Sequence, residues 1–334
     1  MRVSLISRRT FGKSLLASLG LAVLRPSSLV QAQLFGLFLG KGRETPAITS
    51  NEDFYVTSYD LTPEIDLEQW SLHVGGMVKR PTSWSFADLL QRPQTKMIAT
   101  LECIGNTVGG YSIGTAEWEG VKLNHLLDEA GFDPKAFDLV LRGADDYSDS
   151  FPLSRALEED VLLAVKMNGV PLPPDHGYPA RVIVPGIYGM KNVKWLTGLE
   201  LVPHDYKGYW QQQSWSDTAL VKLSSRIDVP GDRELITTPR YTIKGIAFNG
   251  RHAIHQIDVS TDAGKTWNPG MLLPKLSPYT WTPWQFEWRI PQPGEYTLMV
   301  RATNANKAVQ ALTTKPSSTE VMEIHAVTVK VELS

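Results

Sequence analysis

The chain has 334 residues, of which 42% are hydrophobic and 20% charged, the composition of an ordinary globular protein. Its formal net charge of −2 excludes the basic electrostatic footprint that is typical of nucleic-acid-binding proteins. No tandem repeat, heptad or low-complexity tract is visible, and the length is sufficient for two domains after removal of an export signal.

Residues 1–32 have the pattern of a twin-arginine export signal. Arg8 and Arg9 precede an apolar stretch at residues 15–24, which is followed by a small-residue cleavage site. A cytosolic basic helix is the alternative, and the apolar residues 34–39 leave an uncleaved membrane anchor open. Because twin-arginine export carries folded proteins, above all those that load a complex cofactor in the cytoplasm, the signal predicts a periplasmic protein with a cofactor.

Residues 45–227 have a mixed pattern that predicts an irregular α+β domain. Ser85 and Asp88 form a Ser-x-x-Asp cap before one short helix, and Gly131 ends a second helix that has one leucine-rich face. Strand-like runs occur at residues 71–74, 97–103, 181–184 and 193–201. Prolines cluster at residues 171–174, which favours a loop-rich domain over a doubly wound sheet.

Residues 233–334 have a different pattern, which predicts an immunoglobulin-like β-sandwich. Apolar residues alternate with polar ones at residues 296–302 and again at 327–333, and residues 262–265 are typical of a hairpin loop. We place the boundary between the two domains at residues 228–232.

Cys103 is the only cysteine of the chain, so neither an internal disulfide nor a structural zinc site is available to it. The alternation of residues 97–103 predicts a strand that turns the thiol inward at its end, just before the loop with Gly109 and Gly110. From the residues alone, three interpretations stay open. The thiol is an inert core group, a nucleophile, or one ligand of a metal that is held mainly by something else.

Two short motifs suggest other activities. Residues 110–114 match the G-x-S-x-G nucleophile elbow, so a secreted serine hydrolase using Ser112, with His125 or His176, is a rival interpretation. The residues after Ser112 show no helical face, which the elbow requires. His252 and His255 lack the helix and the glutamate of a zinc protease. The chain has no Walker loop, dinucleotide fingerprint or haem-attachment motif. If the protein handles electrons, they must come from or pass to a separate partner, such as a cytochrome or a membrane haem protein.

Longer motifs are more specific. They are residues 101–106, residues 163–169 together with 173–186, and residues 189–195. With these motifs the chain resembles the sulfite oxidase family of molybdopterin enzymes, over essentially its whole length after the signal. The resemblance implies a mixed α/β molybdopterin-binding domain, followed by a β-sandwich through which the family forms homodimers.

The resemblance also implies the site. Cys103 corresponds to the thiolate ligand of molybdenum, and Tyr206 to a tyrosine of the substrate pocket. The positions that match cofactor-binding residues are Tyr55, Val56, Thr57, Asp145, His176, Arg181, Asn192, Val193 and Lys194. Of these, Arg181 and Lys194 match the cations that neutralise the phosphate of the pterin, which is the role that charge-assisted hydrogen bonds serve.

The chain departs from the family at the positions where sulfite-oxidising members carry arginines. These positions correspond here to Thr57, Val108 and Ala326. Losing cationic donors weakens the binding of a small dianion, so we expect a site that is more apolar and less selective for sulfite. Arg142 or Lys207 moving into the pocket is the alternative.

The sequence therefore predicts an exported molybdenum–molybdopterin oxidoreductase that carries out two-electron or oxygen-atom-transfer chemistry on a small molecule. A periplasmic reductase of S-oxides, of the methionine sulfoxide type, is an alternative within the same class. A cofactor-free binding protein on the same scaffold is the third interpretation.

Overall fold

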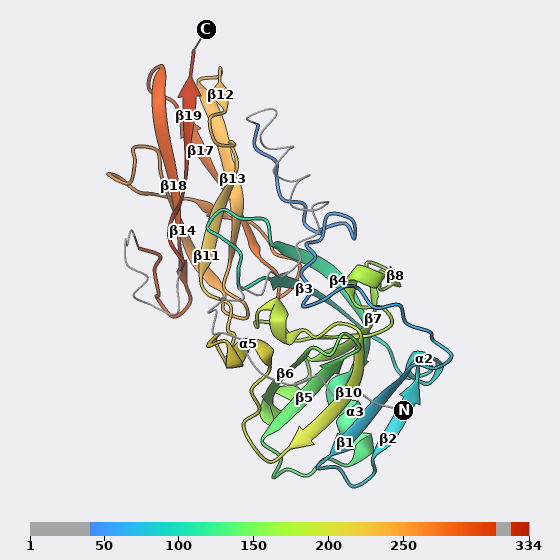
Figure 1. Cartoon of the computed structure of the whole chain (residues 1–334). Coiled ribbons are helices and arrows are strands. Elements are labelled where there is room, and N and C mark those ends of the chain that lie inside the picture. Colours follow the sequence, from blue (N-terminus) through green and yellow to red (C-terminus); the bar gives the residue numbers. More distant parts are fainter. Residues whose placement is uncertain (1–40, 312–321, 334) are drawn as a thin grey trace, which may run out of the picture.

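The structure is a computed structural model that describes residues 41–311 and 322–333. The predicted export signal and the anchor alternative fall in residues 1–40, outside this described part. Among the helices described, none is both long and apolar enough to cross a membrane. Figure 1 shows two lobes, a mixed N-terminal lobe and an all-β C-terminal lobe, in agreement with the predicted fold class.

The N-terminal lobe contains two sheets. The first has the order β2 (Thr82–Ser85), β1 (Ser71–Gly76), β10 (Leu196–Val202), β5 (Asp138–Gly143) and β6 (Ser148–Pro152), with β1 and β10 parallel. The second has the order β3 (Thr95–Glu102), β4 (Ile113–Lys122), β7 (Leu162–Met167) and β8 (Val170–Pro171), with β9 (Arg181–Ile183) also paired to β7. The helices are short: α2 (Phe86–Leu90), α3 (Leu123–Ala130), α4 (Leu153–Ala156), α5 (Tyr209–Gln212), and the 3-10 turns η1 (Pro174–His176) and η2 (Gly189–Lys191).

Local sequence signals explain how the two predicted helices begin and end. Ser85 caps α2 by accepting a hydrogen bond from the backbone of Asp88, whose side chain accepts one from the backbone of Ser85 in return. Gly131 ends α3 in the left-handed conformation, with φ of 70°, which a residue without a Cβ adopts at little cost. Both predictions are confirmed.

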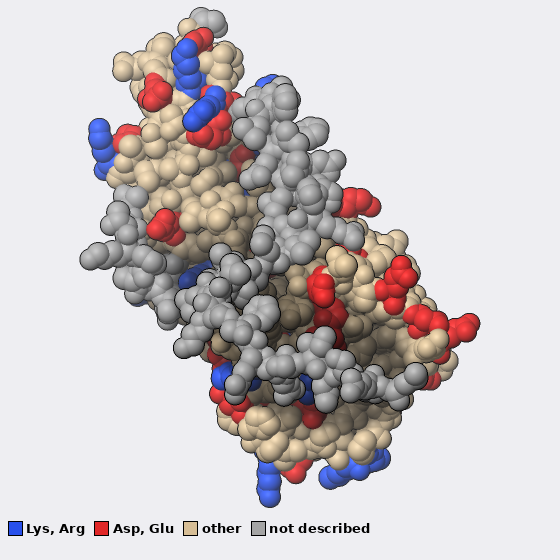
Figure 2. Space-filling model, viewed as in Figure 1, with Lys and Arg blue, Asp and Glu red and all other residues tan. Residues whose placement is uncertain are grey.

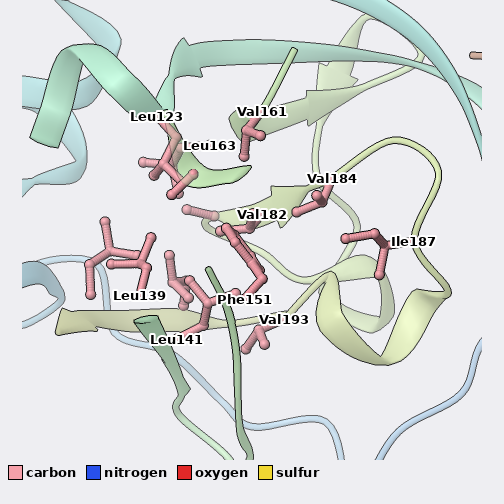
Figure 3. Packing of buried hydrophobic residues seen from close by; sticks show 14 of the residues in the cluster. Leu123, Leu139, Leu141, Phe151, Val161, Leu163, Val182, Val184, Ile187 and Val193 are labelled. Carbon is pink, nitrogen blue, oxygen red and sulfur yellow. The ribbon is translucent and has the colours of Figure 1, made fainter. Parts of the chain in front are cut away.

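The hydrophobic core of this lobe lies between the two sheets. Figure 3 shows Leu139, Leu141 and Phe151, from β5 and β6, directed toward Val182 and its neighbours around β9. All of these side chains are at most 2% exposed. Because burying each one contributes roughly 1.5–3 kcal/mol, this packing fixes where the strand ends and loops of the site lie.

The C-terminal lobe is a sandwich of two antiparallel sheets with one short parallel pairing. One sheet has the order β11 (Ser224–Val229), β13 (Arg240–Phe248), β17 (Thr282–Arg289) and β16 (Met271–Leu272). The other has the order β12 (Leu235–Ile236), β19 (His325–Val331), β18 (Gly294–Asn304), β14 (Ile254–Ser260) and β15 (Asn268–Pro269), in which β12 and β19 run parallel. The predicted hairpin loop joins β14 to β15, with Ala263 and Gly264 at positive φ. The first sandwich strand, β11, lies ahead of residue 233, where we expected the sandwich to start.

One predicted strand is shorter than expected. We predicted a strand over residues 193–201, but β10 begins only at Leu196. Trp195 adopts a left-handed backbone conformation, with φ of 52°, which interrupts the extended chain. Residues 192–194 therefore form a loop, and this loop lines the cavity described next.

Candidate active site

A cavity of about 790 Å³ in the N-terminal lobe brings together most of the predicted site residues. Its lining includes Tyr55, Thr57, Cys103, Asp145, His176, Arg181, Asn192, Val193 and Lys194. These residues come from five separate stretches of sequence. The segment before β1, the loop after β3, the loop between β5 and β6, the segment from η1 to β9, and the loop between η2 and β10 all face the same space. Val56 and Tyr206 are not among the lining residues.

Cys103 is the first residue after β3, which ends at Glu102, one position before the strand end that the sequence predicted. Its backbone N–H donates to the carbonyl of Ser112 (2.9 Å), which ties the two ends of the loop 103–112 together. Burial raises the pKa of the thiol, while hydrogen bonds from Gly105 and Thr57 act in the opposite direction. The thiol thus lies in a cavity wall with its own donors, an arrangement that suits a ligand better than an inert core group.

Arg181 is buried in the same cavity, and no carboxylate of the described residues pairs with it. Its two terminal nitrogens donate to the carbonyls of His176 and Asn192, each at 3.0 Å, and its Nε has no hydrogen-bond partner among the described residues. Burial lowers the pKa of Arg181 to about 10. A buried cation with an unsatisfied N–H is costly unless an anion completes it.

Lys194 lies beside Arg181 at this end of the cavity. Its ammonium donates to the hydroxyl of Ser58 (2.8 Å) and to the carbonyl of Asp175 (3.0 Å). Burial and the neighbouring Arg181 lower the pKa of Lys194 to about 7. Two cations whose charged forms are both disfavoured by burial in one cavity fit a ligand that carries a phosphate.

Three further residues that we predicted to bind the cofactor, His176, Tyr55 and Asp145, differ in their surroundings. The Nε2–H of His176 donates to the carbonyl of Asn51 (2.8 Å), and burial lowers the pKa of His176 to about 4, so the ring is neutral near pH 7. Tyr55 packs closely against Gly189. A Cβ atom at position 189 would lie 2.7 Å from the Tyr55 hydroxyl. Asp145 lines the cavity, and burial raises the pKa of its carboxyl.

Asn192 contributes its backbone rather than its side chain. Its Oδ1 accepts from the N–H of Val184 (2.7 Å), and its Nδ2 donates to the carbonyl of Tyr188 (3.1 Å). The side chain is therefore occupied in shaping the loop, while the carbonyl holds Arg181. The geometry therefore does not support a contact between the side-chain amide of Asn192 and the cofactor.

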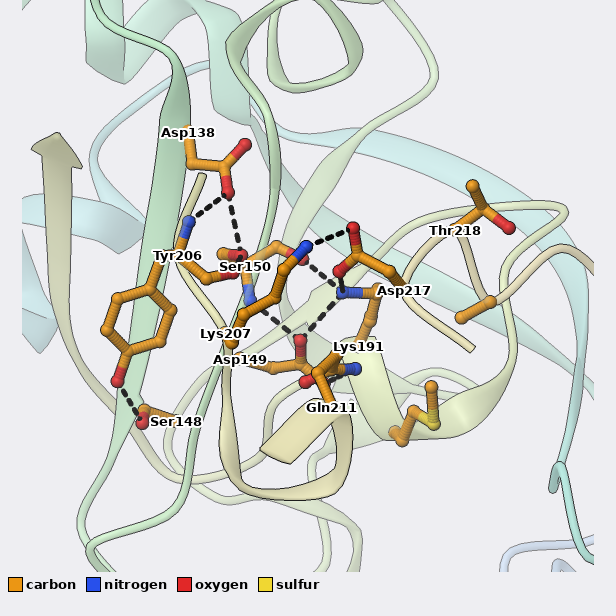
Figure 4. Close-up of polar contacts among 12 residues, drawn as sticks. Asp138, Ser148, Asp149, Ser150, Lys191, Tyr206, Lys207, Gln211, Asp217 and Thr218 are labelled. Atoms are coloured by element: carbon orange, nitrogen blue, oxygen red, sulfur yellow. Dashed lines mark hydrogen bonds and ion pairs between the residues drawn. The ribbon is translucent and has the colours of Figure 1, made fainter. Parts of the chain in front are cut away.

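Tyr206 lies away from the cavity, in a polar network shown in Figure 4. Its hydroxyl is 2.8 Å from that of Ser148, and its backbone N–H donates to Asp138 (2.9 Å). The structure thus does not bring the predicted substrate-pocket tyrosine to the other site residues. The aromatic side chains that do line the cavity, and that the sequence did not predict, are Phe54, Tyr59, Tyr111, Tyr147, Trp195, Trp210 and Trp215. A sequence signal was available only for Trp210 and Trp215, in the aromatic density of residues 206–215.

A buried ion pair between Lys191 and Asp149 lies beside the segments that form the cavity wall (Figure 4). Lys191 of η2 donates to Asp149 of β6 (2.8 Å) and to the carbonyl of Ser150 (2.6 Å). Asp149 also accepts from Gln211 of α5 (3.3 Å) and from the hydroxyl of Tyr147 (3.0 Å). One carboxylate therefore joins three segments that contribute to the cavity wall.

Replacing Lys191 by methionine should destabilise the protein by roughly 3–5 kcal/mol, because it leaves the Asp149 carboxylate buried and unpaired. Denaturant unfolding of the cofactor-loaded protein measures this. Lys207→Met is the matched control, since Lys207 pairs with Asp205 and Asp217 at the surface and should cost less than about 1 kcal/mol. Equal losses in the two variants would show that the buried pair has no special role.

The C-terminal lobe also shapes the cavity, through Arg226 of β11. Its guanidinium donates to the carbonyl of Gly110 and pairs with Asp228 (2.7 Å). The same group lies 4.6 Å from the centre of the Tyr111 ring. The sandwich thus holds the loop 103–112 in place.

Three positions of this chain lack the arginine that sulfite-oxidising members carry, and two of them, Val108 and Ala326, do not line the cavity. Val108 lies in a smaller pocket between the loop 103–112 and the sandwich. Ala326 is an exposed residue of β19, opposite Met299. Only Thr57 is placed at the cavity, where it contacts the thiol of Cys103.

The elbow interpretation of Ser112 does not fit its surroundings. Ser112 is followed directly by β4 (Ile113–Lys122), a strand, whereas the nucleophile elbow needs a helix there. His176, one of the two candidate partners, is engaged with the carbonyl of Asn51.

Family models and relatives agree with this geometry. The model described as oxidoreductase molybdopterin binding domain matches residues 59–210, and that described as Mo-co oxidoreductase dimerisation domain matches residues 218–332. The chain therefore belongs to the sulfite oxidase family of molybdopterin-dependent oxidoreductases, which confirms the resemblance and assigns it the molybdenum–molybdopterin cofactor.

Human sulfite oxidase is 32% identical over 318 residues, which cover 80% of this chain and 58% of the relative. Nitrate reductase [NADH] 1 of Arabidopsis thaliana is 28% identical over 271 residues, covering 64% of this chain and 30% of the relative. The chain thus spans less than two thirds of the length of both. Among solved structures, the sulfane dehydrogenase SoxCD of Paracoccus pantotrophus is similar with a TM-score of 0.71 and 25% identity, covering 90% of this chain and 86% of that chain.

Proposed function

We propose that this protein is an oxidoreductase that uses a molybdenum–molybdopterin cofactor ligated by Cys103, that it acts on an uncharged substrate, and that it is not a sulfite specialist. The observation that carries the proposal is the distribution of charge around the cavity. Among the described residues that line it, the cations Arg181 and Lys194 both belong to the group of residues suited to a phosphate. The wall around Cys103 is built from aromatic, small and uncharged polar side chains.

The residues fit the cofactor in distinct roles. Arg181 and Lys194 would hold the phosphate, and the thiolate of Cys103 would bind the metal, with Thr57 and Gly105 hydrogen-bonded to the sulfur. The bound molybdenum centre supplies two-electron, oxygen-atom-transfer chemistry. Aromatic side chains form part of the cavity wall, so a substrate bound beside Cys103 is partly shielded from water.

For a sulfur substrate the balanced reaction is R2S=O + 2H+ + 2e− → R2S + H2O, or its reverse. The sequence carries no dinucleotide fingerprint and no haem-attachment motif, so we propose a separate electron-transfer partner such as a haem protein. The direction of reaction follows the potential of that partner. Reduction of S-oxides, the alternative already considered, uses the same uncharged wall.

The two cations considered as replacements for the lost arginines are engaged elsewhere. Arg142 donates from Nε (3.1 Å) and Nη2 (2.5 Å) to Glu200, and Lys207 is paired with Asp205 and Asp217. Neither lines the cavity. The proposal of weak sulfite recognition therefore rests on these placements as well as on the sequence.

We expect the kcat/KM for sulfite to be at least about tenfold below that for the best uncharged substrate. One absent charge-assisted hydrogen bond at the position of Thr57, worth roughly 1.5–3 kcal/mol, corresponds to a loss of about 10- to 100-fold. Steady-state assays with a dye mediator, run in both directions on a panel of sulfite, sulfoxides and N-oxides, measure it. Saturable sulfite oxidation at micromolar concentrations would contradict the proposal.

We further propose that the chain is exported by the twin-arginine route and forms a homodimer through its C-terminal lobe. The supports are the Arg8–Arg9 motif and the match of residues 218–332 to a dimerisation-domain family. Replacing Arg8 and Arg9 by lysines should shift the protein from the periplasmic to the cytoplasmic fraction, as measured by immunoblotting. Sedimentation of the purified protein measures its oligomeric state.

A further inference from the structure

Exposed aromatic side chains are concentrated at the rim of the cavity. Four aromatic residues of the described chain are more than about a third exposed, and three of them line the cavity: Tyr59 at 39%, Tyr111 at 57% and Trp215 at 37%. The fourth, Phe137, does not. A cluster of exposed aromatic surface at one opening is a feature of ligand-binding sites rather than of ordinary protein surface.

Aromatic rings at the rim contact one another, either stacked or edge-on. Trp215 stacks on Trp210 with ring centres 4.2 Å apart and planes at 22°. Trp210 packs edge-on against Tyr209, at 4.9 Å, and Tyr209 against Tyr59, at 4.7 Å. These contacts connect Tyr59 to Trp215 through Tyr209 and Trp210, and together with Tyr111 these side chains form the aromatic rim.

Anchors outside the rim hold these rings in place. Gln211, within α5, donates to the buried Asp149 of the ion pair with Lys191 (Figure 4). Tyr111 lies in the loop 103–112, and the guanidinium of Arg226, from β11, packs over its ring. Rings that are positioned before a ligand arrives lose little freedom on binding, so their contacts contribute to affinity and selectivity.

The rim also has no charged lining side chain of its own. Among the described lining residues, the charged groups are Asp145, Asp175, Arg181 and Lys194, which gather around the proposed phosphate position. On the surface view in Figure 2, acidic side chains lie on the flank of the lower lobe. An uncharged, flat group is therefore the best complement of the rim.

We propose that the aromatic rim selects substrates whose reacting S-oxide, or the corresponding thioether, is carried on an uncharged aromatic ring, and that Trp215 is its principal contact. This inference rests on the proposed function and adds the substrate class. Ring faces of a bound substrate and of Trp215 stack in an offset arrangement, which a saturated ring of equal size reproduces poorly. Oxygen removal then follows Ar–S(=O)–CH3 + 2H+ + 2e− → Ar–S–CH3 + H2O, with two equivalents of a reduced one-electron carrier as donor.

Binding measurements on the cofactor-loaded enzyme test the proposal without reliance on turnover. Calorimetric titration compares methyl phenyl sulfoxide with cyclohexyl methyl sulfoxide, which differ in ring aromaticity but little in size. We expect the wild type to bind the phenyl compound about fivefold more tightly. Trp215→Leu should reduce this ratio to near one, and Trp215→Phe should restore most of it. Phe137→Leu, which removes an exposed aromatic ring outside the cavity, should leave the ratio unchanged.

The outcomes separate the two proposals. Equal binding of the two sulfoxides, no detectable binding of either, or a phenyl preference that survives in Trp215→Leu would overturn the aromatic-rim proposal. Tighter binding of a peptide that contains methionine sulfoxide than of the phenyl compound would also overturn it, in favour of a peptide-binding rim. Molybdenum content and sulfite turnover of the same wild-type preparation test the proposed function, so its failure is recognised independently.

Discussion

Replacing Cys103 by serine is expected to reduce turnover by at least about 1,000-fold, while the protein stays folded and keeps most of its pterin. A factor of this size corresponds to roughly 4 kcal/mol of transition-state stabilisation. The reason for the difference between turnover and cofactor content is spatial. The thiol lies in the loop after β3, whereas the phosphate contacts that retain the pterin come from Arg181 and Lys194. A hydroxyl is a harder and less readily ionised ligand than a thiol, so it changes the metal more than it changes the anchor.

Three measurements on the same preparations check this result: dye-linked turnover, metal and pterin content, and thermal unfolding. Ser112→Ala is the matched control, because it alters the same loop and its backbone carbonyl, which accepts from Cys103, remains. We expect Ser112→Ala to retain activity within a few-fold. If Ser112→Ala lost all activity and Cys103→Ser kept it, the serine-hydrolase interpretation would replace the molybdenum one.

The sequence predicted the fold and most of the cavity because strong local signals and long motifs were present. The cap formed by Ser85 and Asp88, the glycine that ends α3, and the alternation before Cys103 are local effects of chain geometry. The site residues were transferred position by position from a resemblance, and the structure brings nine of the eleven to one cavity. The two others, Val56 and Tyr206, lie outside its lining.

The features of the site that the sequence did not predict depend on contacts between segments that are far apart along the chain. The loop 103–112 turns Val108 toward the sandwich because Arg226 of β11 holds that loop. The aromatic rim combines Tyr59, Tyr111 and Trp215, which are far apart along the chain and share no periodicity. Asn192 shows a third limit: its position at the cavity was predicted, but the use of its amide within the loop follows only from tertiary hydrogen bonds.

Arg181→Ala is expected to lower bound pterin to less than about a tenth of wild type, a greater loss than Cys103→Ser causes. Arg181 is the most buried cation of the cavity, and its Nε has no partner among the described residues. Each charge-assisted hydrogen bond to a phosphate contributes roughly 1.5–3 kcal/mol, so removal of the guanidinium weakens retention by one to several powers of ten. Lysine at this position restores the charge but not the planar set of donors, so Arg181→Lys should retain an intermediate amount.

The control for this experiment separates cofactor loss from general destabilisation. Arg155 is also a largely buried arginine, but it pairs with Asp160 (2.5 Å) and does not line the cavity. Arg155→Ala should therefore lower the thermal midpoint and leave the pterin content of the folded protein near that of wild type. Pterin fluorescence after oxidation and molybdenum analysis quantify both variants. A wild-type pterin content in Arg181→Ala would mean that Arg181 serves only to join His176 and Asn192, and that other groups hold the phosphate.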